Sequence, residues 1–456
     1  MSLGQGYSGR RDANQGDPLK QAESAATSVR PSACPGLLRI VQSGDGGLCR
    51  IKLPCGRLHA HQARAVAAAA RQQASGVIEA TNRANLQIRG VRPGAEGALI
   101  ETLLAADLGA PSPGADDLRN LMVSPLLGLE PGVGQTVAAL AERLLALLQD
   151  TPRFHALSPK FALLLDGGEP LAMLEHPHDI WLAALGPQAD APFAFGLAGC
   201  PPLRADDAPA FGAVPAAQVP ALVEALLQLF LDRARPEQTR MRHLLADLGP
   251  AALVAELERR LGTPLQPLPD WRRDTAATLG HLGPVDGRHA GAAAPLGRLD
   301  AAQLDALADL ADQQSDGQLR LTPWQSVLLP APRDLDGTLA ALAALGLVTD
   351  ATAPLARLIA CTGSAGCPRS LADTKADALA LAPRLPPEVQ LHLTGCPRSC
   401  AAAHVAPFTL LARAPGRYDL YQRARDGFGR LLASDLDLEQ ASDRLAATPD
   451  SWSSSE

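Results

Sequence analysis

Pro54-Cys-Gly-Arg-Leu58 and Pro295-Leu-Gly-Arg-Leu299 are two copies of the same short stretch, separated by 241 positions. The correspondence continues without a gap, and thirteen of the thirty-five residues from 54 to 88 are identical to their partners. Alanine is common throughout the chain, but the identities also include Gly76 with Gly317. A match of this length indicates an internal duplication, so the chain is expected to fold as two related halves.

Each copy has the pattern of a strand, a helix and a second strand, which is a unit of the α+β type. In the second copy the apolar residues at helical spacing are Leu304, Leu307, Ala308 and Ala311. A longer α/β segment follows each unit, and residues 119–124 correspond weakly to residues 357–362. We therefore expect the two copies to pair about a pseudo-twofold axis.

Composition excludes several classes of protein. The 456 residues carry a net charge of −7, which argues against a broad nucleic-acid surface because phosphate binding requires a basic field. No apolar run approaches the roughly 20 residues that a membrane helix needs. The first thirty residues lack the apolar region of a signal peptide, so we expect a disordered tail on a cytoplasmic protein.

Four of the eight cysteines lie within forty residues and form two pairs. Cys361 and Cys367 have C-x5-C spacing, and Cys396 and Cys400 have C-x3-C spacing, with a helix predicted to start at Asp373 between the pairs. Four thiolates on two loops can enclose a [4Fe–4S] cluster. Zinc sites favour shorter spacing within a pair, and ordinary core packing does not explain the clustering.

In each pair, a glycine directly precedes one of the two cysteines. Gly366 and Gly395 are expected to let backbone N–H groups approach the cluster sulfurs. The remaining cysteines are scattered and are not expected to bind the cluster: Cys34, Cys49, Cys55 and Cys200.

The cysteine arrangement resembles the cluster signature of sulfite and nitrite reductases, and other segments extend the resemblance over about residues 33–425. Residues 81–87 resemble that family's T-x-R-x-x-x-Q segment, residues 119–125 its R-N…S-P segment, and residues 157–161 its L-P-R-K-F segment. In the family these motifs hold sirohaem and a small anion through two Arg and two Lys. The second Lys is replaced here by Ala162.

The resemblance implies a set of cationic residues for an anionic substrate. Arg240 and Arg242 resemble a basic helical segment that faces the macrocycle, although a solvated helix face explains them equally well. No residue is assigned a catalytic role. The residues expected to bind substrate are Arg83, Arg89, Arg119, Lys160, Arg240 and Arg242.

Residues 34–39, 43–47 and 83–90 resemble the precorrin-3B synthase branch of the family. That branch implies oxygen-dependent hydroxylation of precorrin-3A at C20 with γ-lactone formation. The implied cofactors are a [4Fe–4S] cluster and a mononuclear non-haem iron, without sirohaem. The implied partners are precorrin-3A, dioxygen and an electron donor, either NADH-linked or of the ferredoxin or flavodoxin type, with neither nucleic acid nor membrane.

The resemblance also implies a fold: α+β, with a pseudo-twofold duplication of the sulfite/nitrite reductase type. Two ferredoxin-like half units would alternate with two α/β domains. The expected parts are a disordered tail (1–32), half unit 1 (33–110), α/β domain 1 on the substrate side (111–262), a linker (263–285), half unit 2 (286–348), α/β domain 2 with the cluster (349–446) and a tail (447–456).

Residues 175–179 are the densest group of candidate iron ligands by residue type. The favoured interpretation is a polar loop before a helix that starts near Ile180, with Asp179 as its cap. His392 is expected to be a strand residue near the cluster. Trp324 and Gln325 are expected to pack the second unit, with stacking on the macrocycle as the alternative.

Two other functions stay open. A sirohaem-dependent sulfite or nitrite reductase would be recognised by its absorption spectrum. A non-catalytic electron-transfer or tetrapyrrole-binding subunit would show no turnover alone with substrate, dioxygen and an electron donor.

Overall fold

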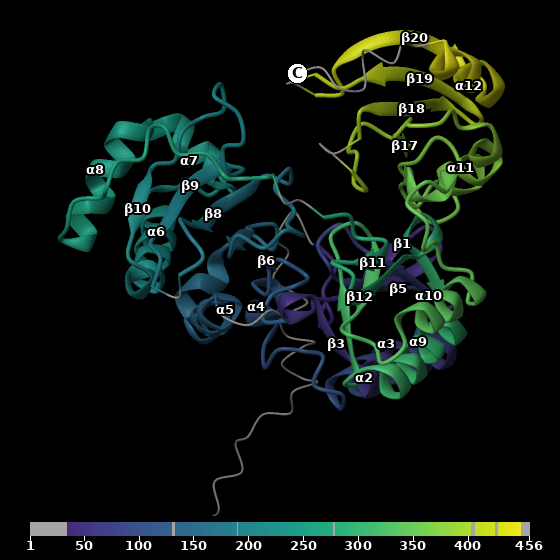
Figure 1. Ribbon diagram of the computed structural model, residues 1–456, viewed down its shortest axis with the longest axis horizontal. Coiled ribbons are helices and arrows are strands. Elements are labelled where there is room, and N and C mark those ends of the chain that lie inside the picture. Colours follow the sequence, from purple (N-terminus) through teal and green to yellow (C-terminus); the bar gives the residue numbers. More distant parts are fainter. Residues whose placement is uncertain are drawn as a thin grey trace, which may run out of the picture. The chain divides into compact units, whose positions relative to one another are not determined.

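The computed structural model describes residues 34–129, 133–188, 190–276, 279–402, 406–424 and 427–447 (Figure 1). Apart from Ala447, the two predicted tails lie outside the described residues. Within the described ranges, no helix is both long and apolar enough to cross a membrane.

The two half units have the same order of elements. The first consists of β1 (Val41–Ser43), β2 (Gly46–Ile51), β3 (Arg57–His59), α2 (Ala60–Gln73), β4 (Val77–Ala80), β5 (Leu86–Val91) and α3 (Glu96–Leu104). The second consists of β11 (Gly283–Val285), β12 (His289–Ala293), β13 (Arg298–Asp300), α9 (Ala301–Gln314), β14 (Gln318–Leu321), β15 (Ser326–Leu329) and α10 (Leu335–Ala344).

The duplication predicted from the repeat is confirmed in the backbone. The matching turns contain Cys55 and Leu296, which have positive φ angles of 55° and 51° at equivalent positions. Such a conformation is uncommon for residues other than glycine. Since both copies of the turn share it, the correspondence extends to the local geometry.

The units exchange a strand. β13 of the second unit pairs with β4 of the first, and β3 of the first pairs with β14 of the second. The sheet orders are therefore β1-β2-β5-β4-β13 and β11-β12-β15-β14-β3. Residues of α2 and α9 share one apolar core with both sheets. This exchange gives the pseudo-twofold pairing expected from the sequence.

The two α/β domains also have matching topology. The first contains α4 (Pro113–Asp117), β6 (Leu121–Val123), α5 (Val133–Asp150), β7 (Leu163–Asp166), β8 (His178–Ala184), β9 (Phe193–Gly199), β10 (Gly212–Val214), α6 (Val219–Arg233), α7 (Met241–Leu248) and α8 (Pro250–Leu261). The second contains β16 (Leu358–Ala360), α11 (Thr374–Leu381), β17 (Leu391–Thr394), β18 (Phe408–Ala414), β19 (Arg417–Gln422), β20 (Arg430–Leu436) and α12 (Leu438–Ala446).

In each of these sheets two parallel pairings are followed by two antiparallel ones. α11 and α12 pack together and against the β16–β20 sheet (Figure 1). The α+β fold with two ferredoxin-like half units and two α/β domains is thus confirmed. Short 3-10 helices span Pro54–Gly56, Pro152–Ala156, Ala216–Gln218, Pro295–Gly297, Pro354–Ala356 and Ala382–Arg384.

One predicted helix is wrong. The chain after Asp179 forms the strand β8, which is buried along its whole length between β7 and β9. Asp179 accepts hydrogen bonds from Ala162 N–H and Met241 N–H instead of capping a helix. The helix predicted from Asp373 is confirmed as α11, and Asp373 accepts a hydrogen bond from Ala376 N–H as its cap.

The segment predicted as a linker packs against the first α/β domain. Trp271 stacks on Trp181 of β8, with ring centroids 6.2 Å apart. Arg273 forms an ion pair with Asp166 at the end of β7, with 2.6 Å between Nε and Oδ2. The Asp166 side chain is fully buried in this pair.

Replacing Arg273 by Ala should destabilise the protein by about 3–5 kcal/mol, because the Asp166 carboxylate would stay buried without its partner. Denaturant unfolding measures this difference in the free energy of unfolding. The control is Arg235→Ala, which removes exposed ion pairs with Glu237 and Asp247 and should lower the free energy of unfolding much less, because water screens these pairs. Equal losses in the two variants would contradict the structural role of Arg273.

Candidate cluster site and ligand recess

The two cysteine pairs follow neighbouring parallel strands. Cys361 comes directly after β16, and Cys396 comes two residues after β17. β16 and β17 pair in parallel, so their carboxyl ends lie at the same edge of the sheet. The fold therefore brings together two loops that are separated by α11 in the sequence.

The four thiols lie within electrostatic reach of one another. Partial desolvation of its sulfur raises the pKa of Cys400, and the thiols of Cys396, Cys361 and Cys367 raise it further. The first three cysteines of the motif are half-buried and Cys400 is exposed. Gathering four thiolates is unfavourable unless positive charge compensates them, which iron ions do.

The two glycines have different roles. Gly395 donates its backbone N–H to Cys361 Sγ at 3.2 Å, as the sequence predicts. Gly366 instead donates to Gly363 O. A Cβ at Gly366 would lie 2.7 Å from Arg89 Nη2, so glycine is needed here for the close approach of that arginine.

These residues offer the donor set of a cubane cluster, which is four cysteine thiols on two loops. Among the described residues, no group of three or more Cys, His, Asp or Glu side chains is placed to hold one metal ion. In a [4Fe–4S] cluster each cysteine binds a different iron, so the sulfurs stand farther apart than around zinc. We therefore assign the cluster, as a proposal, to Cys361, Cys367, Cys396 and Cys400.

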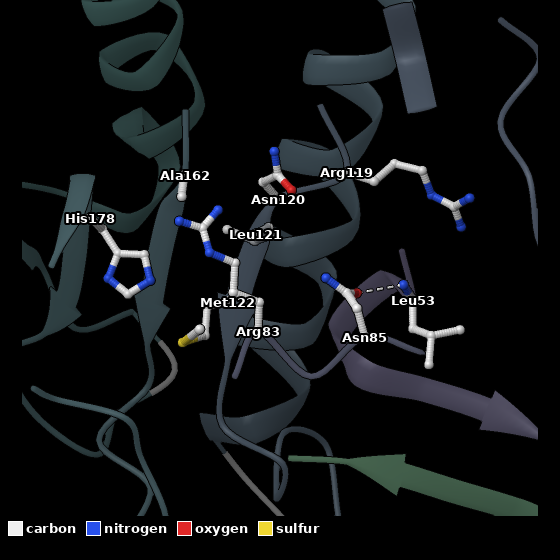
Figure 2. Close-up of a pocket in the computed structure, with 9 residues that line it drawn as sticks. All are labelled: Leu53, Arg83, Asn85, Arg119, Asn120, Leu121, Met122, Ala162 and His178. Atoms are coloured by element: carbon white, nitrogen blue, oxygen red, sulfur yellow. Dashed lines mark hydrogen bonds between the residues drawn. The ribbon is translucent and has the colours of Figure 1, made fainter. Parts of the chain in front are cut away.

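A small recess lies where β4 and β5 meet the first α/β domain. It is too small to enclose a whole small molecule, so it would hold part of a larger ligand. Its lining comprises Leu53, Arg83, Asn85, Arg119, Asn120, Leu121, Met122, Ala162 and His178 (Figure 2).

Arg83 is the main cation of the recess. Within the described part of the chain, its guanidinium has no hydrogen-bond or ion-pair partner. Burial lowers its pKa to about 10, and the positive charges of Arg240 and Arg50 contribute to the shift. Arg83 therefore remains charged at neutral pH, and a ligand carboxylate would supply the missing partner.

The structure separates the other predicted binding residues. Arg119 lines the recess, but its guanidinium donates to Leu108 O and points away from Arg83 (Figure 2). Arg240 binds Asp179 through Nε at 2.9 Å. Lys160 is exposed and is not among the residues that line the recess.

Two further predicted residues lie elsewhere. Arg242 is exposed on α7, where its Nε donates to His243. Arg89 is buried and binds Asp45, Glu79 and Gly366 O. Because its donors are used within the protein, we leave Arg89 out of the ligand-binding residues proposed below.

Residues that sequence analysis missed connect the recess to the cysteines. Asn82, next to Arg83, donates to the backbone carbonyls of Cys400 and Ala401 at 3.3 and 3.1 Å. Arg50 donates to Gln87 and lies close enough to Cys400 for their charges to interact. The positions of Asn82 and Arg50 along the sequence do not indicate that these residues lie near the cysteine motif.

Of the two histidines in residues 175–179, His178 lines the recess. His178 is buried, and within the described ranges its Nδ1 has no hydrogen-bond partner. Glu175 pairs with Arg423, and Asp179 binds Arg240. The described residues therefore supply no ligand set for a mononuclear iron.

The predicted strand position of His392 is confirmed, and Trp324 packs against the first α/β domain as well as the second half unit. His392 lies in β17, close in sequence to the second cysteine pair. Trp324 stacks on His281, with an interplanar angle of 6°, and packs against two apolar clusters of the core.

Comparison with known families agrees with this architecture. Residues 40–106 and 283–345 match the nitrite/sulfite reductase ferredoxin-like half domain, and residues 114–265 match the nitrite and sulphite reductase 4Fe-4S domain. The chain belongs to the nitrite and sulfite reductase family. Membership supports an iron–sulfur cluster and an oxidoreductase activity. The matched 4Fe-4S segment holds only Cys200, so the clustered cysteines lie in its duplicate.

Curated relatives include enzymes of two kinds. The chain is 31% identical to a ferredoxin–nitrite reductase of Zea mays, with 79% of this chain and 68% of that protein covered. It is 30% identical to the ferredoxin–nitrite reductase of Synechococcus elongatus, with 80% and 76% covered. It is 26% identical to a precorrin-3B synthase of Sinorhizobium sp, with 88% and 85% covered.

A solved structure supports the fold. The NirA protein of Mycobacterium tuberculosis superposes with a TM-score of 0.72 over 87% of this chain and 79% of that chain. The sequence identity is 23%.

Proposed function

We propose that this protein hydroxylates precorrin-3A at C20 in the cytoplasm, with closure of a γ-lactone by the ring A acetate, as precorrin-3B synthase does in aerobic cobalamin biosynthesis. One atom of dioxygen forms the hydroxyl group. The other leaves as water after taking up two electrons from the donor and two protons. The names of the nitrite reductase relatives support a ferredoxin-type donor.

The observation that carries the proposal is Ala162 in the lining of the recess, where the family resemblance places a second lysine. A small inorganic anion needs a dense cage of positive charge. Here Lys160 is exposed and the Arg119 guanidinium is bound to Leu108 O. A recess with fewer positive charges and an apolar wall at Ala162 suits one edge of a carboxylated macrocycle better than it suits a small inorganic anion.

Residues of the chain would orient the macrocycle. Arg83 would bind a carboxylate side chain, with Arg240 and Arg50 adding positive potential nearby. The Asn82 contacts to the cysteine loop would keep the ligand close to the cluster. When bound, the iron–sulfur cluster would supply single electrons. No step is assigned to a mononuclear iron, because the described residues lack ligands for one.

The match to the precorrin-3B synthase covers 85% of that protein, which adds support to the proposed activity. The second candidate is a sirohaem-dependent nitrite or sulfite reductase, which the higher identity to nitrite reductases favours. A non-catalytic electron-transfer or tetrapyrrole-binding subunit is the third.

The purified protein should show the broad absorption of an iron–sulfur cluster without sirohaem bands. Anaerobic incubation with precorrin-3A, followed by a reductant and isotopically heavy dioxygen, should give a product with one heavy oxygen atom by mass analysis. Omitting the reductant or dioxygen should abolish the product. Stoichiometric sirohaem with nitrite- or sulfite-dependent turnover would establish the second candidate instead, and macrocycle binding without turnover would establish the third.

A further inference from the structure

A group of buried charges lies between the first half unit and the cysteine loops. Glu79 on β4 faces Arg298 at 3.0 Å, Arg89 at 3.4 Å and Lys375 at 3.8 Å. Glu79, Arg89 and Lys375 are at most 9% exposed. These four residues are called the Glu79 ion cluster below.

The Glu79 ion cluster contacts both ends of the first cysteine loop. Thr362, which follows Cys361, donates its hydroxyl to Glu79 Oε2 at 3.3 Å. Gly366, which precedes Cys367, accepts a hydrogen bond from Arg89 at 2.8 Å through its carbonyl. The same carbonyl accepts bonds from Ser43 Oγ and Gly44 N–H.

Lys375 is the third cation of this group. Its Nζ donates to Leu296 O, and the preceding residue Thr374 has its hydroxyl 3.3 Å from Cys361 Sγ. Burial lowers the pKa of Lys375, but Glu79 and Cys361 oppose the shift. Burial would raise the pKa of Glu79, but the three cations outweigh it and hold the pKa below its usual value.

The duplication shows that the scaffold does not require this arrangement. The positions equivalent to Glu79 and Arg298 are Arg320 and Arg57, which face each other across β14 and β3. Arg320 is buried, and its Nε and Nη1 have no hydrogen-bond partner in the described part of the chain. One fold position thus holds a carboxylate beside the paired cysteines in one half and a cation near the single Cys55 in the other.

We propose that the Glu79 ion cluster is a positioning unit that holds the Cys361–Cys367 loop and sets the reduction potential of the iron–sulfur cluster through its net positive charge. This inference rests on the proposed cluster site, but not on the identity of the substrate. The three cations exceed the single carboxylate of Glu79, and Asp45 neutralises only part of the excess. Net positive charge favours the reduced, more negative state of the cluster and so raises its potential.

Midpoint potentials of the full-length holoprotein, measured by redox titration with electron paramagnetic resonance, test the sign of the effect. Lys375→Met should lower the potential, because a positive charge is removed. Glu79→Gln should raise it, because a negative charge is removed. Lys375→Arg, which keeps the charge, should match the wild type. Arg320→Met, the control at the duplicated position, should leave the potential unchanged.

Iron content, measured on the same samples, separates the potential from cluster loss. If the Glu79 ion cluster had a purely structural role, Lys375→Met and Glu79→Gln would reduce the iron content. The two variants would not shift the potential of the remaining iron–sulfur clusters in opposite directions. Identical potentials in wild type, Lys375→Met and Lys375→Arg would overturn the proposal, even if Glu79→Gln failed to fold. A cluster that survives in the cysteine variants would instead overturn the assigned ligands, and the present proposal with them.

Discussion

Replacing Cys396 by Ala should remove the iron–sulfur cluster, with loss of nearly all protein-bound iron and sulfide and of the visible absorption. The same result is expected for Cys361, Cys367 and Cys400. Each variant removes one of the four thiolate ligands that hold the cubane. Cys400 is exposed, so water can reach the cluster at that position. Iron and sulfide analysis of the purified variants measures the effect.

The other cysteines supply the controls. Replacing Cys34, Cys49, Cys55 or Cys200 by Ala should leave four irons per chain. Cys34→Ala and Cys200→Ala are the best matched of these, because both cysteines are half-buried like three of the proposed ligands. Four irons retained in Cys396→Ala would contradict the assignment of the cluster site.

Arg83→Ala should weaken binding of a carboxylated tetrapyrrole roughly 10- to 100-fold. A charge-assisted hydrogen bond contributes about 1.5–3 kcal/mol, and the Arg83 guanidinium has no partner among the described residues to replace the ligand. Affinity for precorrin-3A, measured anaerobically by absorbance or fluorescence titration, tests this expectation. The iron content should stay at the wild-type value, because within the described ranges Arg83 has no hydrogen bond or ion pair with a proposed cluster ligand.

Two comparisons define the role of Arg83. Arg259→Ala removes an exposed arginine that pairs with Glu256 on α8, and it should leave the affinity unchanged. Arg119→Ala and Lys160→Ala should affect binding less than Arg83→Ala, because Arg119 is bound to Leu108 O and Lys160 is exposed. Wild-type affinity in Arg83→Ala would rule out the proposed carboxylate contact.

The errors in the sequence analysis have identifiable causes. Residues 180–184 form an uninterrupted apolar run, and such a run does not distinguish a buried strand from a buried helix. Here β8 is covered on both faces, so it lacks the alternating pattern of a half-exposed strand. The role predicted for Gly366 was also incomplete. Glycine is needed there because of the close approach of Arg89, which lies 277 positions away in the sequence.

The predicted substrate-binding arginines show the same limit. Sequence motifs place these residues in the correct segments, but they do not identify the partner of each guanidinium. Only the folded chain shows that Arg89 belongs to the Glu79 ion cluster and that Arg83 lines the recess. Lys375 is one of four lysines in a chain rich in arginine, which is a weak indication that it has a specific role.

The sequence by itself determined the duplication, the strand–helix–strand units and the two cysteine loops, because these depend on local spacing and on repetition along the chain. The tertiary structure alone decided which distant charges meet. Glu79 and Lys375 are 296 positions apart, and their pairing depends on how the second α/β domain packs against the first half unit. Burial of charged groups becomes favourable only when opposite charges converge, so the buried ion pairs and the recess followed from packing and could not be read from the sequence pattern.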